Sequence, residues 1–117
     1  MTEQQEEIIR SGITYATHEC HAVASDKGWW DEPRLAPECF MLMVSEIAEA
    51  LEEYRNNKGD YYIGEKGKPE GIGVELADLL IRVFDYCGKF NIDIGKIIIE
   101  KMKYNETRPY RHGNKVC

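Results

Sequence analysis

Two pairs of acidic residues, each with a three-residue spacing, are the part of this chain best suited to chemistry. Glu46 and Glu49 form the first pair, and Glu75 and Asp78 form the second. Residues three apart lie on one face of a helix, so each pair directs two carboxylates to the same side. Both pairs sit within apolar helical patterns, where ionised carboxylates are costly unless a cation or a donor compensates them. The pattern indicates a divalent metal site.

The position of the two pairs along the chain predicts that they face each other. If the helix with the first pair ends near Asn57 and the next begins near Gly71, Glu49 lies about 12 Å before the turn and Glu75 about 6 Å after it. In an antiparallel hairpin the two pairs then lie within about one helical turn of each other. Carboxylates that meet at one point suit hard cations, so we expect Mg²⁺, with Mn²⁺ as a second choice.

Four helical segments are expected to hold these residues, and they predict an all-α fold. We expect them over residues 2–26, 34–57, 69–88 and 91–108. Thr2 is the expected cap of the first segment, and Asn91 or Asp93 that of the fourth. A chain of 117 residues fits one domain, over residues 1–117. Apolar rows on several helix faces predict that another subunit completes the core, in a homodimer or homotetramer.

The charge of the chain is distributed unevenly, and this narrows the class of partner. The net charge is −6, but the segment 96–117 is basic. An acidic body with one basic end argues against nucleic-acid binding, which favours a broad basic face. It fits a small polyanion held between metal ions and a few cationic side chains. A solvated basic tail explains the charge equally well.

Other features of the sequence predict a cytoplasmic protein. The chain has no apolar run of the length that spans a membrane, and its acidic first residues are unlike a secretory signal. The four cysteines show no C-x-x-C pairing, which favours reduced thiols.

The connection 59–68, between the second and third segments, is longer than most helix connections. Its aromatic and lysine side chains fit a lid over the site, and a mobile loop without a function is an equal alternative.

Three ordered segments carry a resemblance to a known family. They are Ser-Glu-Ile-Ala-Glu-Ala at 45–50, Gly-Val-Glu-Leu-Ala-Asp-Leu-Leu-Ile-Arg at 73–82, and Lys-Met-Lys-Tyr-Asn-Glu-Thr-Arg-Pro at 101–109. They resemble the all-α nucleoside triphosphate pyrophosphohydrolases of the MazG-like superfamily, which includes dCTP pyrophosphatases and dimeric dUTPases. The first two match that family's E-x-x-E and E-x-x-D metal pattern, and the third matches its K-x-x-x-N-x-x-R phosphate segment. With 28–30, 68–72 and 111–113, the likeness extends over about residues 8–113.

This resemblance implies a four-helix MazG-like bundle and a specific reaction. A nucleoside triphosphate would be cleaved between its α and β phosphates to give the monophosphate and pyrophosphate, which cleans or controls a nucleotide pool. Either Glu46 or Glu49 would accept the proton of the attacking water. The residues that would grip the triphosphate recur at intervals of four and three, on one face of the last helix. They are Lys101, Asn105 and Arg108.

Several alternatives stay open from the sequence. Trp30 is placed to stack on the base, although core packing is the commoner fate of tryptophan. His112, with the residue before it, either reaches the substrate or lies at the helix end, where cations are favoured. The stripe of Asp78, Arg82 and Asp85 also fits a surface ladder of ion pairs. A di-iron bundle is disfavoured because the chain has no Glu-x-x-His. The remaining class is a non-enzymatic helical interaction module with solvated acidic faces, and the preferred base is not determined.

Overall fold

The fold is built almost entirely from helices, as the sequence predicts. The computed structural model describes residues 1–111. Within this range the α-helices are α1 (Glu3–Asp26), α2 (Ala36–Arg55), α3 (Ile72–Lys89) and α4 (Ile94–Glu106). Two short strands, β1 (Tyr62–Ile63) and β2 (Pro69–Glu70), flank the short 3₁₀ turn η1 (Glu65–Gly67) between α2 and α3. His112 and Cys117 lie outside the described residues, and Cys20, Cys39 and Cys87 are free thiols.

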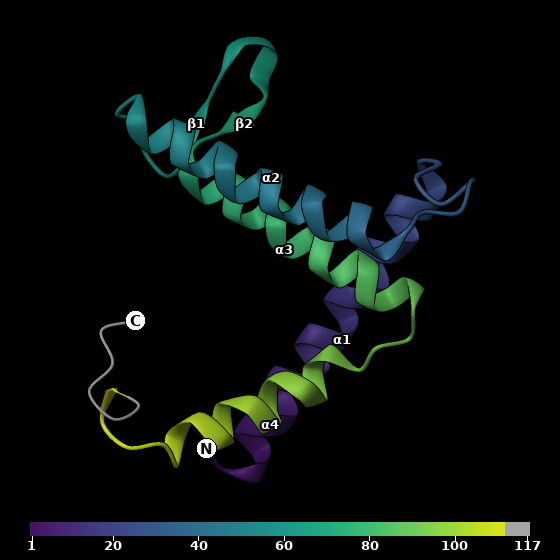
Figure 1. Cartoon of the computed structure of the whole chain (residues 1–117), viewed down its shortest axis with the longest axis vertical. Coiled ribbons are helices and arrows are strands. Elements are labelled where there is room, and N and C mark those ends of the chain that lie inside the picture. The colour runs from purple at the N-terminus through teal and green to yellow at the C-terminus, as the bar shows by residue number, and fades with distance from the viewer. Residues whose placement is uncertain (112–117) are drawn as a thin grey trace.

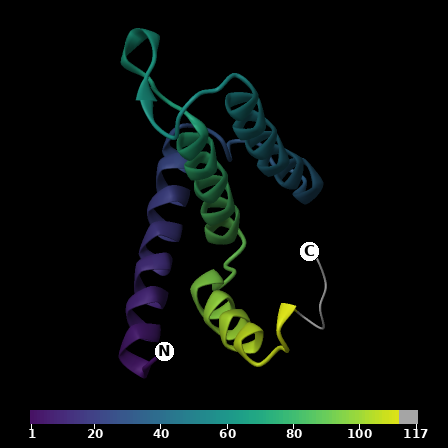
Figure 2. The same cartoon turned by 90° about the vertical axis from the view of Figure 1, so that its left-hand side faces the viewer.

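The other helices contact the long helix α1 in two separate regions. α3 packs against both α1 and α2, and α4 packs against α1. Figure 1 shows α2 and α3 side by side as an antiparallel hairpin. α3 and α4 lie along different halves of α1. The turned view in Figure 2 shows the same separation of α4 from the beginning of α3. The helices of one chain therefore lie in a more open arrangement than the expected four-helix bundle.

Capping side chains set the ends of the first and last helices. Thr2 Oγ1 accepts a hydrogen bond from the Gln5 backbone N–H at 3.1 Å, and Gln5 Oε1 accepts one from the Thr2 N–H at 2.9 Å. This reciprocal capping box confirms the expected start of α1. Of the two candidate caps for α4, Asp93 is the one used, since its Oδ1 accepts from the Lys96 N–H at 3.1 Å. Asp93 also pairs with Arg10 of α1 at 2.9 Å, which joins the two helices.

The connection between α2 and α3 is an antiparallel ribbon in which Tyr62 pairs with Glu70. The sequence does not predict these strands. The Tyr62 hydroxyl donates to Glu53 of α2 at 2.9 Å, so the ribbon is attached to the helix that precedes it. Burial together with the neighbouring Glu53 carboxylate raises the pKa of Tyr62 to about 12. A lid function for this segment stays a prediction.

The start of α3 is fixed by backbone contacts with the residues that follow α2. Gly71 has a φ of +127°, and a Cβ at this position would meet the Asp60 carbonyl oxygen at 2.5 Å. Only glycine accepts this backbone and this approach without strain. The next N–H groups bond back to the connection, from Ile72 to Gly59 at 3.0 Å and from Gly73 to Asp60 at 2.8 Å. These contacts place Glu75 in the first turn of α3.

No helix of the described residues has the length and apolar character needed to cross a membrane.

Candidate metal centre

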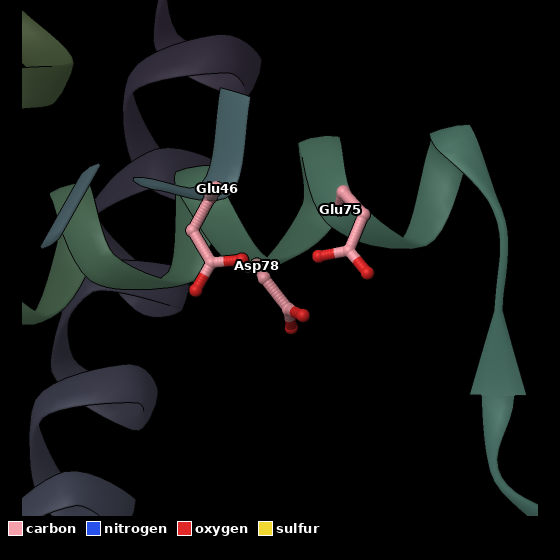
Figure 3. Close-up of side chains that lie close together, drawn as sticks. All are labelled: Glu46, Glu75 and Asp78. Carbon is pink, nitrogen blue, oxygen red and sulfur yellow. The ribbon is translucent and has the colours of Figure 1, made fainter. Parts of the chain in front are cut away.

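Three of the four predicted carboxylates meet where α2 packs on α3. Glu46 of α2 and Glu75 and Asp78 of α3 each offer one oxygen, and these oxygens lie within 4.8 Å of one another. Figure 3 shows the three side chains directed toward a shared space between the two helices. The expected facing of the two pairs is therefore confirmed for these residues. We call Glu46, Glu75 and Asp78 the carboxylate cluster.

The burial of the carboxylate cluster distinguishes it from an ordinary acidic surface. Glu46 is only 6% exposed, and Glu75 and Asp78 are partly buried. Among the described residues, Glu46 Oε2 and Glu75 Oε2 are buried side-chain oxygens without any hydrogen-bond partner. Buried polar atoms nearly always have a partner, and an unpaired charged oxygen is costlier still. Two such atoms in one cluster make it a candidate cation site.

Arg82 is the one basic side chain of the described residues that an ion pair links to the cluster. Its Nε donates to Glu46 Oε1 at 2.8 Å, and the Arg82 side chain is 32% exposed. The alternative of a surface ion-pair ladder does not hold for Arg82, because Arg82 bonds across to Glu46 of α2 instead of along α3. The bond occupies one oxygen of Glu46 and leaves the other directed to the cluster. Sequence reasoning missed this contact, since its spacing suggested only local partners.

Proton affinities in the cluster are raised. Burial is the largest cause that raises the pKa of Glu75, to about 8, and the nearby carboxylates of Glu49 and Glu46 raise it further. The pKa of Asp78 is also raised, first by burial and then by the charge of Glu46, while Arg82 and Lys68 act in the opposite direction. Because carboxylate ligands must be deprotonated, a cation that binds here would compete with these protons and displace them.

Glu49 lies beside the cluster and differs from its members in exposure. It is exposed, it lines a shallow pocket together with Glu75, and its negative charge helps to raise the pKa of Glu75. The structure therefore places all four predicted carboxylates near one another, with Glu49 outside the group of three. Buried carboxylate oxygens without nitrogen or sulfur ligands fit a hard cation such as Mg²⁺ or Mn²⁺.

The predicted phosphate residues do not reach the cluster within one chain. Lys101 and Asn105 are exposed on α4, and Arg108 follows the end of that helix. Lys101 Nζ lies 4.8 Å from the centre of the Tyr104 ring, and the Arg108 guanidinium carbon lies 6.0 Å from it. α4 packs on α1, away from the start of α3 (Figure 2). The three residues are thus close to one another but apart from the carboxylates.

Trp30 lies in a contact network next to a hollow that borders the cluster. Its Nε1 donates to Asp85 Oδ1 at 2.8 Å, and the same oxygen lies 2.9 Å from His21 Nδ1. The Trp30 ring also packs edge-on against Phe90. These contacts favour the structural alternative for Trp30 and agree with a structural role for Asp85. The hollow has a volume of about 460 Å³, and Trp29 is the aromatic residue that lines it. Its other lining residues include Glu46, Asp78 and Arg82.

Removing a ligand should weaken cation binding. We expect wild-type protein to bind Mg²⁺ or Mn²⁺ in titration calorimetry, and Glu75→Gln and Asp78→Asn to bind at least about 10-fold more weakly, because each loses a charged ligand. Glu100→Gln is the matched control, since Glu100 is exposed on α4. Equal affinities in all four proteins would rule out the cluster as the binding site.

Replacing Arg82 should destabilise the metal-free protein. Arg82→Met leaves the buried Glu46 carboxylate without its cation, so we expect a loss of about 3 kcal/mol in the free energy of unfolding, measured by urea in EDTA. Saturating Mg²⁺ should recover part of this loss, because a bound ligand stabilises the folded state. Arg55→Met is the control, since Arg55 is exposed and lies 4.0 Å from Glu52. If Arg82→Met and Arg55→Met have the same free energy of unfolding, the Glu46–Arg82 pair does not stabilise the metal-free protein.

The raised pKa of Glu75 predicts how stability depends on pH. The pKa of about 8 in the folded state lies above the ordinary value of 4.5 for glutamate, so the folded state holds the extra proton between these two pH values. In EDTA, stability should therefore fall as pH rises through this window, and Glu75→Gln should make the fall shallower. Urea unfolding at a series of pH values measures the slope, with Glu100→Gln as control. An unchanged slope in Glu75→Gln would contradict the assignment.

Comparisons with known proteins give no relative from which a function is transferred. Neither protein-family models, nor curated proteins, nor solved structures match this chain. The evidence for a metal centre is therefore the geometry and burial of the carboxylate cluster.

Proposed function

We propose that this protein is a Mg²⁺-dependent nucleoside triphosphate pyrophosphohydrolase. It cleaves its substrate between the α and β phosphates and releases the nucleoside monophosphate and pyrophosphate. The observation that carries the proposal is the pair of buried, unpartnered oxygens on Glu46 and Glu75, within a cluster of three converging carboxylates. The MazG-like pattern of the three sequence segments supports the choice of reaction.

The carboxylates divide into cation ligands and a base. Magnesium held by Glu46, Glu75 and Asp78 would neutralise negative charge that develops on the phosphate oxygens during cleavage. A water oxygen bonds to phosphorus as the bond to the bridging oxygen breaks, and a carboxylate takes the proton of the water. One oxygen of Glu46 accepts a hydrogen bond from Arg82, whereas Glu49 is exposed to solvent. Glu49 is therefore the better base of the two candidates.

Two further parts of the site bind the substrate. The hollow beside the cluster has room for a nucleoside, and Arg34 stacks on Trp29 at its edge, 5.3 Å from the ring centre. Lys101, Asn105 and Arg108 would neutralise the triphosphate. Because α4 lies away from the cluster in one chain, these residues act on the site of a second copy.

A panel of nucleoside triphosphates tests the reaction. With Mg²⁺ present, we expect wild-type protein to release pyrophosphate from at least one triphosphate, and Glu49→Gln to lower kcat by about 100-fold or more, because proton transfer to a base contributes this much. Glu52→Gln, on an exposed position of the same helix, is the matched control. If orthophosphate is the only product, the enzyme cleaves the terminal phosphate instead.

A mixture of two inactive variants completes this test. Asp78→Asn lacks a cation ligand and Arg108→Ala lacks a phosphate contact, so a mixture recovers activity only if one site takes residues from two chains. If wild-type protein is active but the mixture recovers no activity, the proposed reaction stands and the role of the second copy is wrong. No product from any triphosphate would favour the non-enzymatic interaction module.

A further inference from the structure

The hollow beside the carboxylate cluster has apolar walls and a row of charged groups. It is lined by residues of α1 and α3, by Glu46 of α2, and by Trp29 and Arg34 from the segment before α2. Its apolar lining residues are Val23, Ala24, Trp29 and Ile81. Three charged lining residues of α3 recur at intervals of four and three, which places them on one face of the helix. They are Asp78, Arg82 and Asp85, and we call them the charged row.

Asp85, at the end of the charged row, has one occupied oxygen and one open oxygen. Its Oδ1 accepts from Trp30 Nε1 at 2.8 Å and lies 2.9 Å from His21 Nδ1. Oδ2 forms no hydrogen bond with the described residues, and it is not among their buried oxygens that lack a partner, so it is accessible to solvent. The Asp85 side chain is only 17% exposed. Two contacts therefore hold this carboxylate in place and leave one acceptor for a ligand of the hollow.

Arg82 offers donors beside this acceptor. Its Nε donates to Glu46 Oε1 at 2.8 Å, and its terminal nitrogens form no hydrogen bond with the described residues. A guanidinium has five N–H donors, so four of them stay available. Asp85 follows Arg82 by three residues, and the two side chains are neighbours on the helix surface. Together they present a donor next to an acceptor at one wall of the hollow.

The charged row leads from the candidate metal centre to this pair of groups. Asp78 belongs to the carboxylate cluster, and Asp85 lies seven residues further along α3. Seven residues are two turns, which span about 10 Å along the helix axis. A nucleotide whose phosphates are bound at the cluster extends over this distance, because the sugar separates its phosphates from its base. The edge of the base is then the part that meets Arg82 and Asp85.

We propose that Asp85, together with Arg82, selects a base that carries an exocyclic amino group beside an unprotonated ring nitrogen, as cytosine and adenine do. The inference rests on the proposed function, which places the phosphates at the cluster, and it names the class of base. The amino group donates to Asp85 Oδ2, and the ring nitrogen accepts from Arg82.

Other bases fit this pair of groups less well. Uracil and hypoxanthine carry a carbonyl oxygen where cytosine and adenine carry the amino group. This oxygen lies next to the ring N–H, so a carboxylate that accepts from the N–H also meets an oxygen lone pair. Guanine presents two adjacent N–H donors, which suit a carboxylate with both oxygens free, whereas Asp85 Oδ1 is already bonded. The arrangement therefore discriminates by the group beside the ring nitrogen.

Two pairs of triphosphates that differ in this group test the selection. They are dCTP with dUTP, and dATP with the hypoxanthine analogue dITP. With Mg²⁺ present, we expect wild-type protein to have a kcat/KM for pyrophosphate release at least about 10-fold higher for the amino member of a pair, because hydrogen bonds to a base edge discriminate by this order. Pyrophosphate release at equal rates within both pairs, or faster from the carbonyl members, would overturn the base selection while the reaction stands.

Asp85→Asn tests the residue. Asparagine keeps an oxygen for Trp30 and His21 but places an N–H donor where Oδ2 stands, and a donor suits a carbonyl oxygen. We expect the preference for the amino member to fall by at least about 10-fold or to reverse. Asp26→Asn is the matched control, because Asp26 is exposed at the end of α1 and does not line the hollow. A purely structural Asp85 would lower both members of a pair equally, and an unchanged ratio in Asp85→Asn would overturn the assignment.

Binding without cleavage separates base selection from the reaction. The α,β-imido analogues of the same triphosphates are titrated into wild-type protein and Asp85→Asn in the calorimeter, with Mg²⁺ present. We expect wild-type protein to bind an amino analogue at least about 10-fold more tightly than its carbonyl counterpart, and Asp85→Asn to lose this difference. Selective binding without pyrophosphate release would contradict the proposed reaction and support the base selection. Equal dissociation constants within both pairs, or no binding, would overturn the base selection.

Discussion

The mutual repulsion of carboxylates at the α2–α3 contact is the constraint on which the functional architecture depends. Glu46 is nearly buried there, and only one of its oxygens is neutralised, by Arg82. The two helices bring Glu75 and Asp78 into the same space although each added negative charge makes the contact less favourable. The backbone bonds at Gly71 hold the start of α3 in place against this repulsion. A proton on Glu75 or a bound cation would offset this charge, which makes the cluster a candidate metal centre.

Local signals in the sequence predicted the helices well, because capping and periodicity act over a few residues. Thr2 and Asp93 cap their helices as expected, and the acidic pairs face each other because their distances from the turn are similar. The strands of the ribbon were missed since two-residue strands have no periodicity to detect. The partner of Arg82 was missed for a different reason: Asp78 lies one turn away on the same helix, and only tertiary packing decides that Glu46 is bound instead.

The position of α4 is the part of the fold that sequence reasoning had no means to predict. A short connection requires that α4 begin near the end of α3, but several neighbouring helices can receive it. Its contact with α1 follows from the pair between Arg10 and Asp93, and from Gly95, where a Cβ would meet the Arg10 carbonyl oxygen at 2.9 Å. Lys103 of α4 pairs with Glu6 of α1 at 3.3 Å, so the basic side chains of α4 lie beside the start of α1 and apart from the carboxylate cluster.

The two long edges of α2 lie in different surroundings. Glu46 and Ala50 are buried where α2 packs on α3, while Val44 and Ile47 are about half exposed on another side of the helix. The ion pair between Glu46 and Arg82 joins α2 to α3 across this contact. Because Glu46 approaches the carboxylates of α3 only through the packing of the two helices, a change that moves α2 as a unit would also change the geometry of the cluster.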